Sequence, residues 1–252
     1  MSTARSAYAI VIGNEILSGK VRDTNSAFLA RVLWEVGTTL EGIEVVPDDR
    51  DRIVEAIHRC RQGRDFLFTT GGVGPTHDDI TLAAIAAAFD VPLERNARYE
   101  ELLRSLYRDH VTDEVLAMAD LPRGARLIES EGLRFPLVTV ENVYVFPGAP
   151  GIFESKLTAV RELFRGTSFA LRTIYTTADE AEIAPLLDDV QERYRDTVRI
   201  GSYPVYEAED HRGFCTVEGE GLRDVEAAAR EIVEAMGASR VVRVDAVDPK
   251  EG

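Results

Sequence analysis

Cysteine is scarce in this sequence, which holds only Cys60 and Cys215. The two lie far apart along the chain, and neither belongs to a CxxC pair or to the Cys/His spacing of a zinc site. We therefore expect no thiolate metal site. The low cysteine content also favours a reduced, cytoplasmic protein.

Long hydrophobic runs are absent as well. The apolar run nearest the N-terminus covers residues 7–12 and has no cleavage-site pattern after it, so it is too short for the core of a signal peptide. No segment approaches the roughly 18 apolar residues that a membrane-spanning helix needs. These absences predict a soluble protein with no membrane partner.

Positive charge is in deficit, with 29 Lys and Arg against 44 Asp and Glu and a net charge of -15. Nucleic acids and anionic lipids are held by clustered Lys and Arg, so the charge argues against both as partners. A phosphorylated small molecule stays compatible, because the backbone N–H groups of a glycine-rich loop bind phosphate even on an acidic surface.

Strand and helix patterns alternate over the first 90 residues. Continuous apolar runs predict buried strands at residues 8–12, 38–46 and 65–70, and helical spacing predicts helices at residues 24–37, 51–60 and 79–89. This alternation is typical of an α/β domain with a doubly wound, mainly parallel sheet and right-handed crossovers. Further helix is expected over residues 96–120, short strands between 126 and 146, and a closing helix that ends near Phe164.

The remainder of the chain follows a different order of elements. A strand, a helix, two strands, a helix and a last strand are expected in turn, which is the split βαββαβ arrangement of ferredoxin-like domains. Residues 165–169 read as a linker. We therefore predict two domains, residues 1–166 and a smaller α+β domain at residues 167–252.

The stretch TTGGVGPTHDDIT, residues 69–81, combines flexible backbone with acidic side chains. Its three glycines permit positive φ or a close approach to a ligand, and a helix is expected to begin near Asp78. Backbone N–H groups at a helix start suit a phosphate, and the adjacent Asp78 and Asp79 are compatible with one when a divalent cation lies between them. His77 is a candidate for phosphate contact or proton transfer.

The same stretch can also be explained as an ordinary helix start with no functional role. Thr76, followed three positions later by Asp79, fits a capping-box-like helix start, and acidic residues in a first turn favour the helix dipole by themselves. The stretch is not a Walker A loop, because no GK[ST] occurs, and it lacks the third glycine of a dinucleotide-binding fingerprint.

Three further turns follow predicted strands. They are GNEILSGK (13–20), VVPDD (45–49) and FPGAPG (146–151). Because ligands bind at the carboxyl ends of parallel strands, all four loops are expected to meet at one edge of the sheet.

Six stretches resemble a known family. GNEILSG, DTNSAFLARVL, VVPDD, TTGGVGPTHDDIT, RFPLVTVENVYVFPGAPGIF and IGSYP together are similar to the molybdopterin-binding-domain family, which includes the molybdopterin adenylyltransferases and the N-terminal half of competence/damage-inducible protein A. The strongest likeness is to the molybdopterin-binding-like domain fused to eukaryotic FAD synthase. Asn14 departs from the family, because it stands where many members have Asp in GDEI.

The resemblance implies a pocket that handles phosphates and nucleotides. In the adenylyltransferase members, the acidic residues important for metal and catalysis fall in PD and DxT motifs, whose positions match Asp48 and Asp79. The competence-protein and FAD-synthase relatives are associated with divalent-metal-dependent pyrophosphatase activity on FAD or ADP-ribose-type substrates. Hydrolysis of a dinucleotide with Mg, Mn or Co is therefore the expected function, and a homo-oligomer, dimer or trimer, the expected assembly.

Two other functions fit the same motifs. One is a non-catalytic protein that binds molybdopterin or a flavin, and the other is a molybdopterin adenylyltransferase-like enzyme. The predicted catalytic residues are Asp48, Asp79 and His77; the predicted metal ligands are Asp48, Asp79 and Asp78; and the predicted phosphate or ligand contacts are Gly13, Glu15, Ser18, Gly19, Thr70, Gly71, Gly72, Gly74, Pro75, Thr76, Pro147, Gly148 and Pro150.

Overall fold

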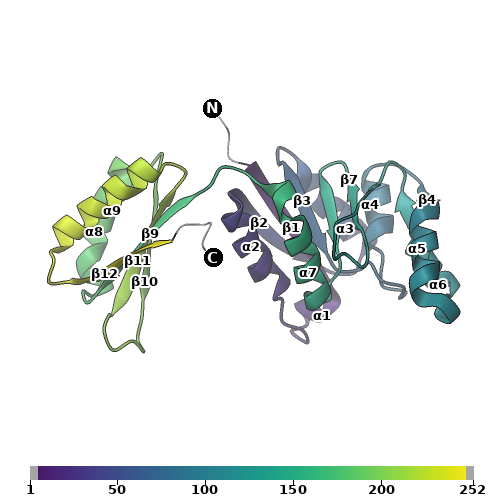
Figure 1. Ribbon diagram of the computed structural model, residues 1–252, viewed down its shortest axis with the longest axis horizontal. Helices are drawn as coiled ribbons and strands as arrows, with labels where there is room; N and C mark the ends of the chain where they lie inside the picture. Colours follow the sequence, from purple (N-terminus) through teal and green to yellow (C-terminus); the bar gives the residue numbers. More distant parts are fainter. Residues whose placement is uncertain (1–4, 248–252) are drawn as a thin grey trace. The chain divides into compact units, whose positions relative to one another are not determined.

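A six-stranded sheet with the order β2-β1-β3-β8-β7-β6 lies at the centre of the first part of the chain (Figure 1). The computed structural model describes residues 5–247, which divide between Gly166 and Thr167 into two compact units. The parallel strands of the first unit are β2 (Thr38–Val46), β1 (Arg5–Ile12), β3 (Phe66–Thr70) and β8 (Val143–Phe146). Strands β7 (Leu137–Val140) and β6 (Arg126–Ile128) continue the sheet in antiparallel pairing. The predicted mainly parallel sheet is confirmed.

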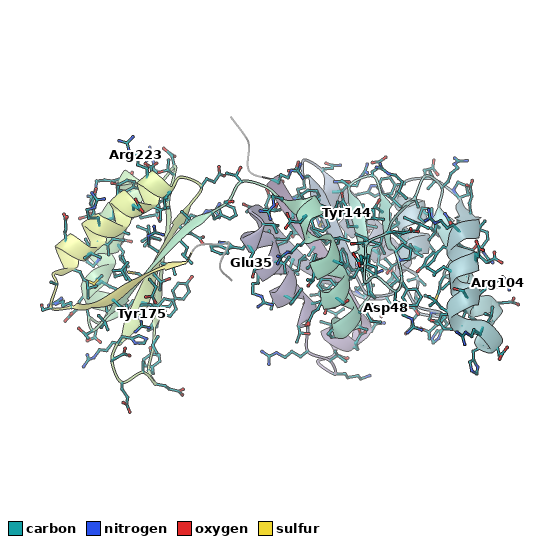
Figure 2. All side chains as sticks on the ribbon, viewed as in Figure 1. Glu35, Asp48, Arg104, Tyr144, Tyr175 and Arg223 are labelled. Atoms are coloured by element: carbon teal, nitrogen blue, oxygen red, sulfur yellow. The ribbon has the colours of Figure 1, made fainter. Side chains whose placement is uncertain are left out.

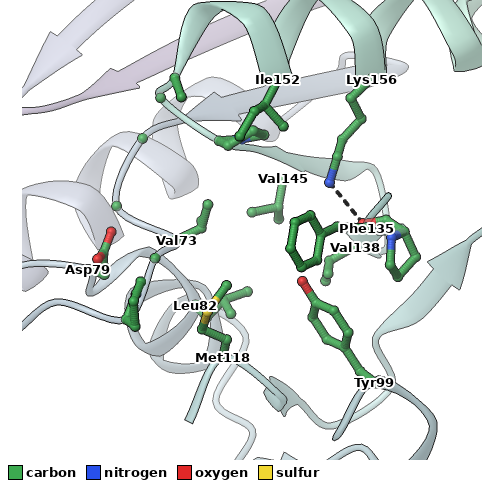
Figure 3. A pocket seen from close by; sticks show the side chains of 18 of the residues that line it. Val73, Asp79, Leu82, Tyr99, Met118, Phe135, Val138, Val145, Ile152 and Lys156 are labelled. Atoms are coloured by element: carbon green, nitrogen blue, oxygen red, sulfur yellow. Dashed lines mark hydrogen bonds between the residues drawn. The ribbon is translucent and has the colours of Figure 1, made fainter. Parts of the chain in front are cut away.

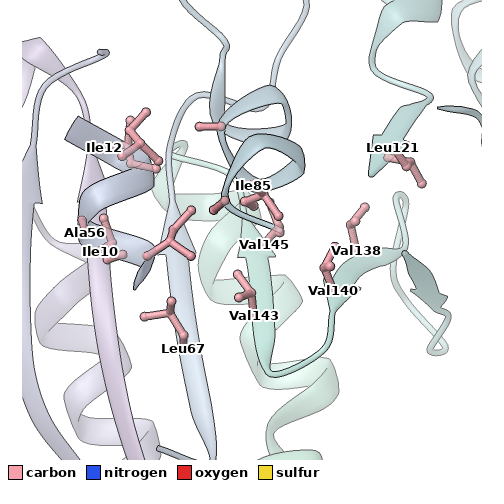
Figure 4. Packing of buried hydrophobic residues seen from close by; sticks show 14 of the residues in the cluster. Ile10, Ile12, Ala56, Leu67, Ile85, Leu121, Val138, Val140, Val143 and Val145 are labelled. Atoms are coloured by element: carbon pink, nitrogen blue, oxygen red, sulfur yellow. The ribbon is translucent and has the colours of Figure 1, made fainter. Parts of the chain in front are cut away.

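Helices cover both faces of this sheet. On one face, α2 (Asn25–Glu35), α7 (Pro150–Val160) and the 3-10 helix η2 (Arg161–Phe164) bury a cluster that includes Phe66 and Phe68 of β3. On the other, α3 (Arg50–Arg61) and α4 (Thr81–Ala88) pack on Ile10, Ile12 and Leu67 (Figure 4). Every residue of β3 is buried, which is why Phe66, Leu67 and Phe68 follow one another without alternating with polar residues.

The region between α4 and β6 differs from its prediction. The helix expected over residues 96–120 is present but divided: α5 (Ala97–Tyr107) is followed by the 3-10 helix η1 (Arg108–His110) and by α6 (Asp113–Ala117). Arg108 has a positive φ of 48°, which ends α5, and the Thr112 side chain caps a new helix. A two-stranded sheet of β4 (Leu93–Arg95) and β5 (Asp120–Pro122) was not anticipated, nor was the short α1 (Asn14–Leu17).

The second unit has the predicted ferredoxin-like order, which is confirmed. It runs β9 (Ala170–Thr176), α8 (Glu180–Arg193), β10 (Arg199–Pro204), β11 (Gly213–Gly219), α9 (Leu222–Met236) and β12 (Val241–Val247), with the antiparallel strand order β10-β11-β9-β12. Both helices pack on one face over a core of their own. Strand alternation places Tyr175 (labelled in Figure 2) and Phe214 on the other face, with their ring centroids 5.6 Å apart. No helix among residues 5–247 is long and apolar enough to cross a membrane.

We expect Phe68→Ala to reduce the stability of the first unit strongly. Its ring is 1% exposed and lies 4.7 Å, centroid to centroid, from that of Phe164. Truncation leaves a cavity, so the free energy of unfolding should fall by roughly 3–5 kcal/mol. Urea unfolding followed by the fluorescence of Trp34, the single tryptophan, reports on this unit alone. Leu163→Ala at a 43% exposed position is the control, with an expected change of about 0.5 kcal/mol or less.

Candidate functional site

The four predicted loops meet at the carboxyl edge of the parallel strands. The N–H of Asn14, after β1, donates to Oδ2 of Asp48, after β2, over 2.8 Å. The N–H of Gly71, after β3, donates to the carbonyl of Phe146 at the end of β8 over 3.2 Å, and the Thr70 hydroxyl donates to the carbonyl of Pro147 over 3.0 Å. Hydrogen bonds thus join the loops in pairs that follow the neighbours in the sheet.

The first two glycines of the loop after β3 occupy positions that exclude other residues. Gly71 has a φ of 105°, and a Cβ there would lie 2.1 Å from the carbonyl oxygen of Ile12. Gly72 has a φ of 64°, and its Cβ would lie 2.5 Å from Oγ1 of Thr81. Both the dihedral angles and the contacts therefore require glycine. This close packing brings the end of β3 directly against the end of β1.

The turn at residues 76–79 is separate from the helix that follows it. Helix α4 begins at Thr81, not near Asp78 as predicted, because the N–H and hydroxyl of Thr81 bind the carbonyls of Gly72 and Gly71. Asp79 Oδ2 instead accepts the N–H of Thr76 at 2.8 Å and lies 2.5 Å from the Thr76 hydroxyl. The capping-box-like pairing of Thr76 and Asp79 thus exists, but it closes a turn before the helix.

Asn25 is a buried polar residue behind the loops that the sequence interpretation missed. Its side chain is 6% exposed, and its Nδ2 donates to the Thr70 hydroxyl at 3.0 Å and to the Gly148 carbonyl at 2.9 Å. One residue of α2 therefore holds the ends of two strand loops together. Its motif, DTNS before a helix, is indistinguishable in sequence from an ordinary helix cap.

A pocket of about 430 Å³ opens against the glycine loop (Figure 3). Eight of the predicted site residues line it: Glu15, Gly71, Gly72, Gly74, Pro75, Asp79, Pro147 and Gly148. The others do not: Gly13, Ser18, Gly19, Asp48, Thr70, Thr76, His77, Asp78 and Pro150. Thr70 is buried and supports the loop through its hydrogen bonds, whereas His77 is exposed on the turn.

The far half of the pocket was not predicted and is mainly apolar. Leu82, Met118, Phe135, Val138, Val145 and Ile152 form its walls, and we call this part the apolar chamber. Tyr99 of α5 and Lys156 of α7 also face it (Figure 3). Burial raises the pKa of Tyr99 to about 12 and lowers the pKa of Lys156 to about 8. Both are thus polar groups held in a largely dry environment.

A signal for Lys156 was present in the sequence. Phe153, Leu157 and Val160 form the buried stripe of α7, and Lys156 is in that stripe at the i+3 position after Phe153. A lysine at a core position of an amphipathic helix is unusual and marks a functional candidate.

The acidic residues fit a cation that arrives together with phosphates. Within residues 5–247, no three His, Cys, Asp or Glu side chains converge on a point that could hold a metal ion. Mg²⁺ commonly takes only one or two carboxylates and completes its coordination with water and substrate phosphates. Asp79 lines the pocket, whereas Asp48 follows β2, which β1 separates from β3 in the sheet. In each of these two carboxylates, one oxygen accepts a backbone N–H and the other oxygen has no such bond among the described residues. A hydrogen bond from Thr76 lowers the pKa of Asp78 and keeps it ionised.

Asn25→Ala should loosen the loops that form the pocket. The change removes two hydrogen bonds, one to the buried Thr70 hydroxyl and one to the carbonyl of Gly148. We expect the free energy of unfolding to fall by roughly 1–3 kcal/mol. Urea titration measures it, and Asn14→Ala at an exposed position serves as the matched control. Equal stability of the two variants would contradict the supporting role of Asn25.

Two family matches cover most of the chain. The family described as "Probable molybdopterin binding domain" matches residues 8–166, and the one described as "FAD synthase, middle domain" matches residues 168–245. A "Probable FAD synthase" of Caenorhabditis briggsae is 32% identical over 251 residues, covering 88% of this chain and 48% of the relative. The chain thus spans about half the length of that protein.

Two relatives match this chain over most of their own length. A protein of Archaeoglobus fulgidus is 33% identical over 195 residues, which cover 77% of this chain and 84% of the relative. The crystal structure of the protein CinA from Thermoplasma acidophilum superposes with a TM-score of 0.59 at 31% identity, covering 64% of this chain and 98% of that one. This chain therefore belongs to the molybdopterin-binding-domain family, and in it that domain is followed by an FAD synthase middle domain.

Proposed function

We propose that this chain is a divalent-cation-dependent pyrophosphatase that hydrolyses a dinucleotide such as FAD or ADP-ribose. The observation that carries the proposal is the composition of the pocket. One end is formed by the glycine loop and Asp79, and the other end is the apolar chamber. A dinucleotide has the same two parts, since charged phosphates are joined to flat, largely apolar rings.

The loop end offers donors for phosphate oxygens. The Gly71 N–H is used by the Phe146 carbonyl, but the N–H groups of Val73 and Gly74 have no hydrogen-bond partner within residues 5–247. Both residues line the pocket. Free backbone N–H groups in a glycine-rich turn are suited to bind phosphate without a lysine or arginine.

The acidic side chains would hold the cation. Asp79 is fixed in orientation by Thr76, and Asp48 by the Asn14 N–H, with Asp78 at the outer side of the same turn. A bound divalent cation offsets phosphate charge and makes water more acidic. In the reaction, a water oxygen bonds to one phosphorus, the bridging P–O bond breaks, and its electron pair stays on the departing phosphate. FAD would thus give FMN and AMP.

The descriptions of the relatives favour one candidate substrate over the other. Proteins described as FAD synthases contain both parts of this chain, which favours FAD. FAD and ADP-ribose are each incubated with the protein and Mg²⁺, Mn²⁺ or Co²⁺, and the AMP released from each substrate is measured by chromatography. Tight binding of flavin or pterin without AMP release would assign the chain to the non-catalytic class instead.

Asp79→Asn should lower the rate of AMP release by about 100-fold or more, because it removes the charge that holds the cation. The asparagine retains an oxygen that accepts the Thr76 N–H, so the turn is preserved. Asp113→Asn, in the first turn of α6, removes one negative charge away from the pocket and should leave the rate unchanged. Full turnover by Asp79→Asn would refute its role as a cation ligand.

A further inference from the structure

We infer that Lys156 recognises the carbonyl edge of a planar heteroaromatic ring in the apolar chamber, and thereby selects the flavin-like half of the ligand over its adenine half. This inference rests on the proposed function, because it states which half of a dinucleotide enters the chamber. The ligand class is a fused ring system with ring carbonyl oxygens, as in flavins.

The position of Lys156 is costly unless a ligand uses it. The side chain is 7% exposed, and its Nζ donates to the carbonyl of Pro136 over 2.9 Å. Within residues 5–247, no carboxylate lies within 4.0 Å of this nitrogen. An ammonium group has three donors, and burying it without a counter-ion is unfavourable. A ligand acceptor in the chamber would supply the missing partner.

The choice of lysine over arginine is unusual in this chain. Only three of its 29 basic residues are lysines, and the other two are Lys20 and Lys250. Arginine stays charged and presents a wide planar fork, whereas lysine is a compact donor whose charge adapts to burial. A buried position beside an apolar chamber therefore suits lysine better than arginine.

The walls around Lys156 fit a flat ring. Ile152 lies one turn before it on the same face of α7, and Phe135, Val138 and Met118 complete the chamber. Figure 3 shows Lys156 and Asp79 on opposite sides of the pocket, with the Tyr99 hydroxyl directed into the chamber near Phe135. An aromatic and aliphatic enclosure with a few polar groups is the usual form of a cofactor-ring site.

The chamber is also matched to the charge distribution of such a ligand. The acidic side chains that line the pocket, Glu15 and Asp79, belong to the loop end, where a cation and phosphates would bind. Tyr99 and Tyr107 are the other titratable groups that line it. Lys156 is thus the one cation among the lining residues, and carbonyl oxygens are its natural partners.

Binding of riboflavin tests this without any hydrolysis, because riboflavin has the ring and lacks phosphate. Quenching of its fluorescence by the intact chain, without divalent cation, gives the dissociation constant. We expect Lys156→Met to weaken the binding of riboflavin and of FMN by roughly 10- to 100-fold, since a hydrogen bond from a charged donor is lost. The affinity for AMP should stay the same. Arg161 lies outside the pocket, so Arg161→Met removes one positive charge elsewhere and should change the affinity for neither riboflavin nor AMP.

The outcomes separate this inference from the proposed function. Riboflavin binding that depends on Lys156 in a chain without AMP release would support the inference and overturn the pyrophosphatase. AMP release from FAD, together with equal riboflavin affinity in the native chain and Lys156→Met, would overturn the inference alone. Lys156→Gln keeps a donor and should recover part of the riboflavin affinity. If the role of Lys156 were purely structural, its substitution would instead weaken the binding of AMP and of riboflavin alike.

The affinity for riboflavin should also depend on pH. Burial lowers the pKa of Lys156 to about 8, so the ammonium form prevails at lower pH and is lost as the pH rises through that value. The charged form is the stronger donor. Riboflavin affinity in the native chain should therefore decline between about pH 7 and 9, whereas in Lys156→Met it should stay flat over the same range. Parallel pH profiles for both proteins would contradict the assignment.

Discussion

The close packing of the Gly71 backbone on the carbonyl of Ile12 is the constraint on which the site depends. Because no side chain fits between them, the loop after β3 turns sharply over the end of β1. That turn allows the Gly71 N–H to donate to the Phe146 carbonyl, and a Cβ on Gly148 would lie 3.3 Å from the Cα of Gly71. Val73 and Gly74 of the same loop line the pocket. A larger residue at position 71 would displace three strand ends at once.

Much of this edge could be predicted because its determinants are local or follow from parallel topology. Glycines report special backbone geometry directly, and the convergence of loops follows from parallel strands. The error at Asp78 has a tertiary cause. Acidic residues before an alanine-rich run indicate a helix start, but hydrogen bonds from Thr81 to the glycine turn shift that start by three residues.

The apolar chamber could not be assembled from the sequence, because its walls come from distant segments. Tyr99 and Phe135 are far apart in the chain and meet only when α5 and the segment before β7 fold against the sheet. Asn25 could not be recognised for another reason. A buried asparagine that links two loops and an exposed asparagine that caps a helix look the same in the sequence, because both stand at the start of a helix. Lys156 alone carried a visible signal, namely a charge within the buried stripe of α7.

The two ends of the pocket differ in how freely they can change. At the loop end, Gly71 and Gly72 stand where a Cβ would collide with neighbouring atoms, so their substitution damages the fold before it alters chemistry. The chamber is built from side chains of several segments, among them Leu82 of α4, Phe135 before β7 and Ile152 of α7, and volume-conserving exchanges there need only local repacking. Changes in ligand preference among proteins with this architecture would therefore arise in the apolar chamber, while the backbone geometry of the glycine loop stays fixed.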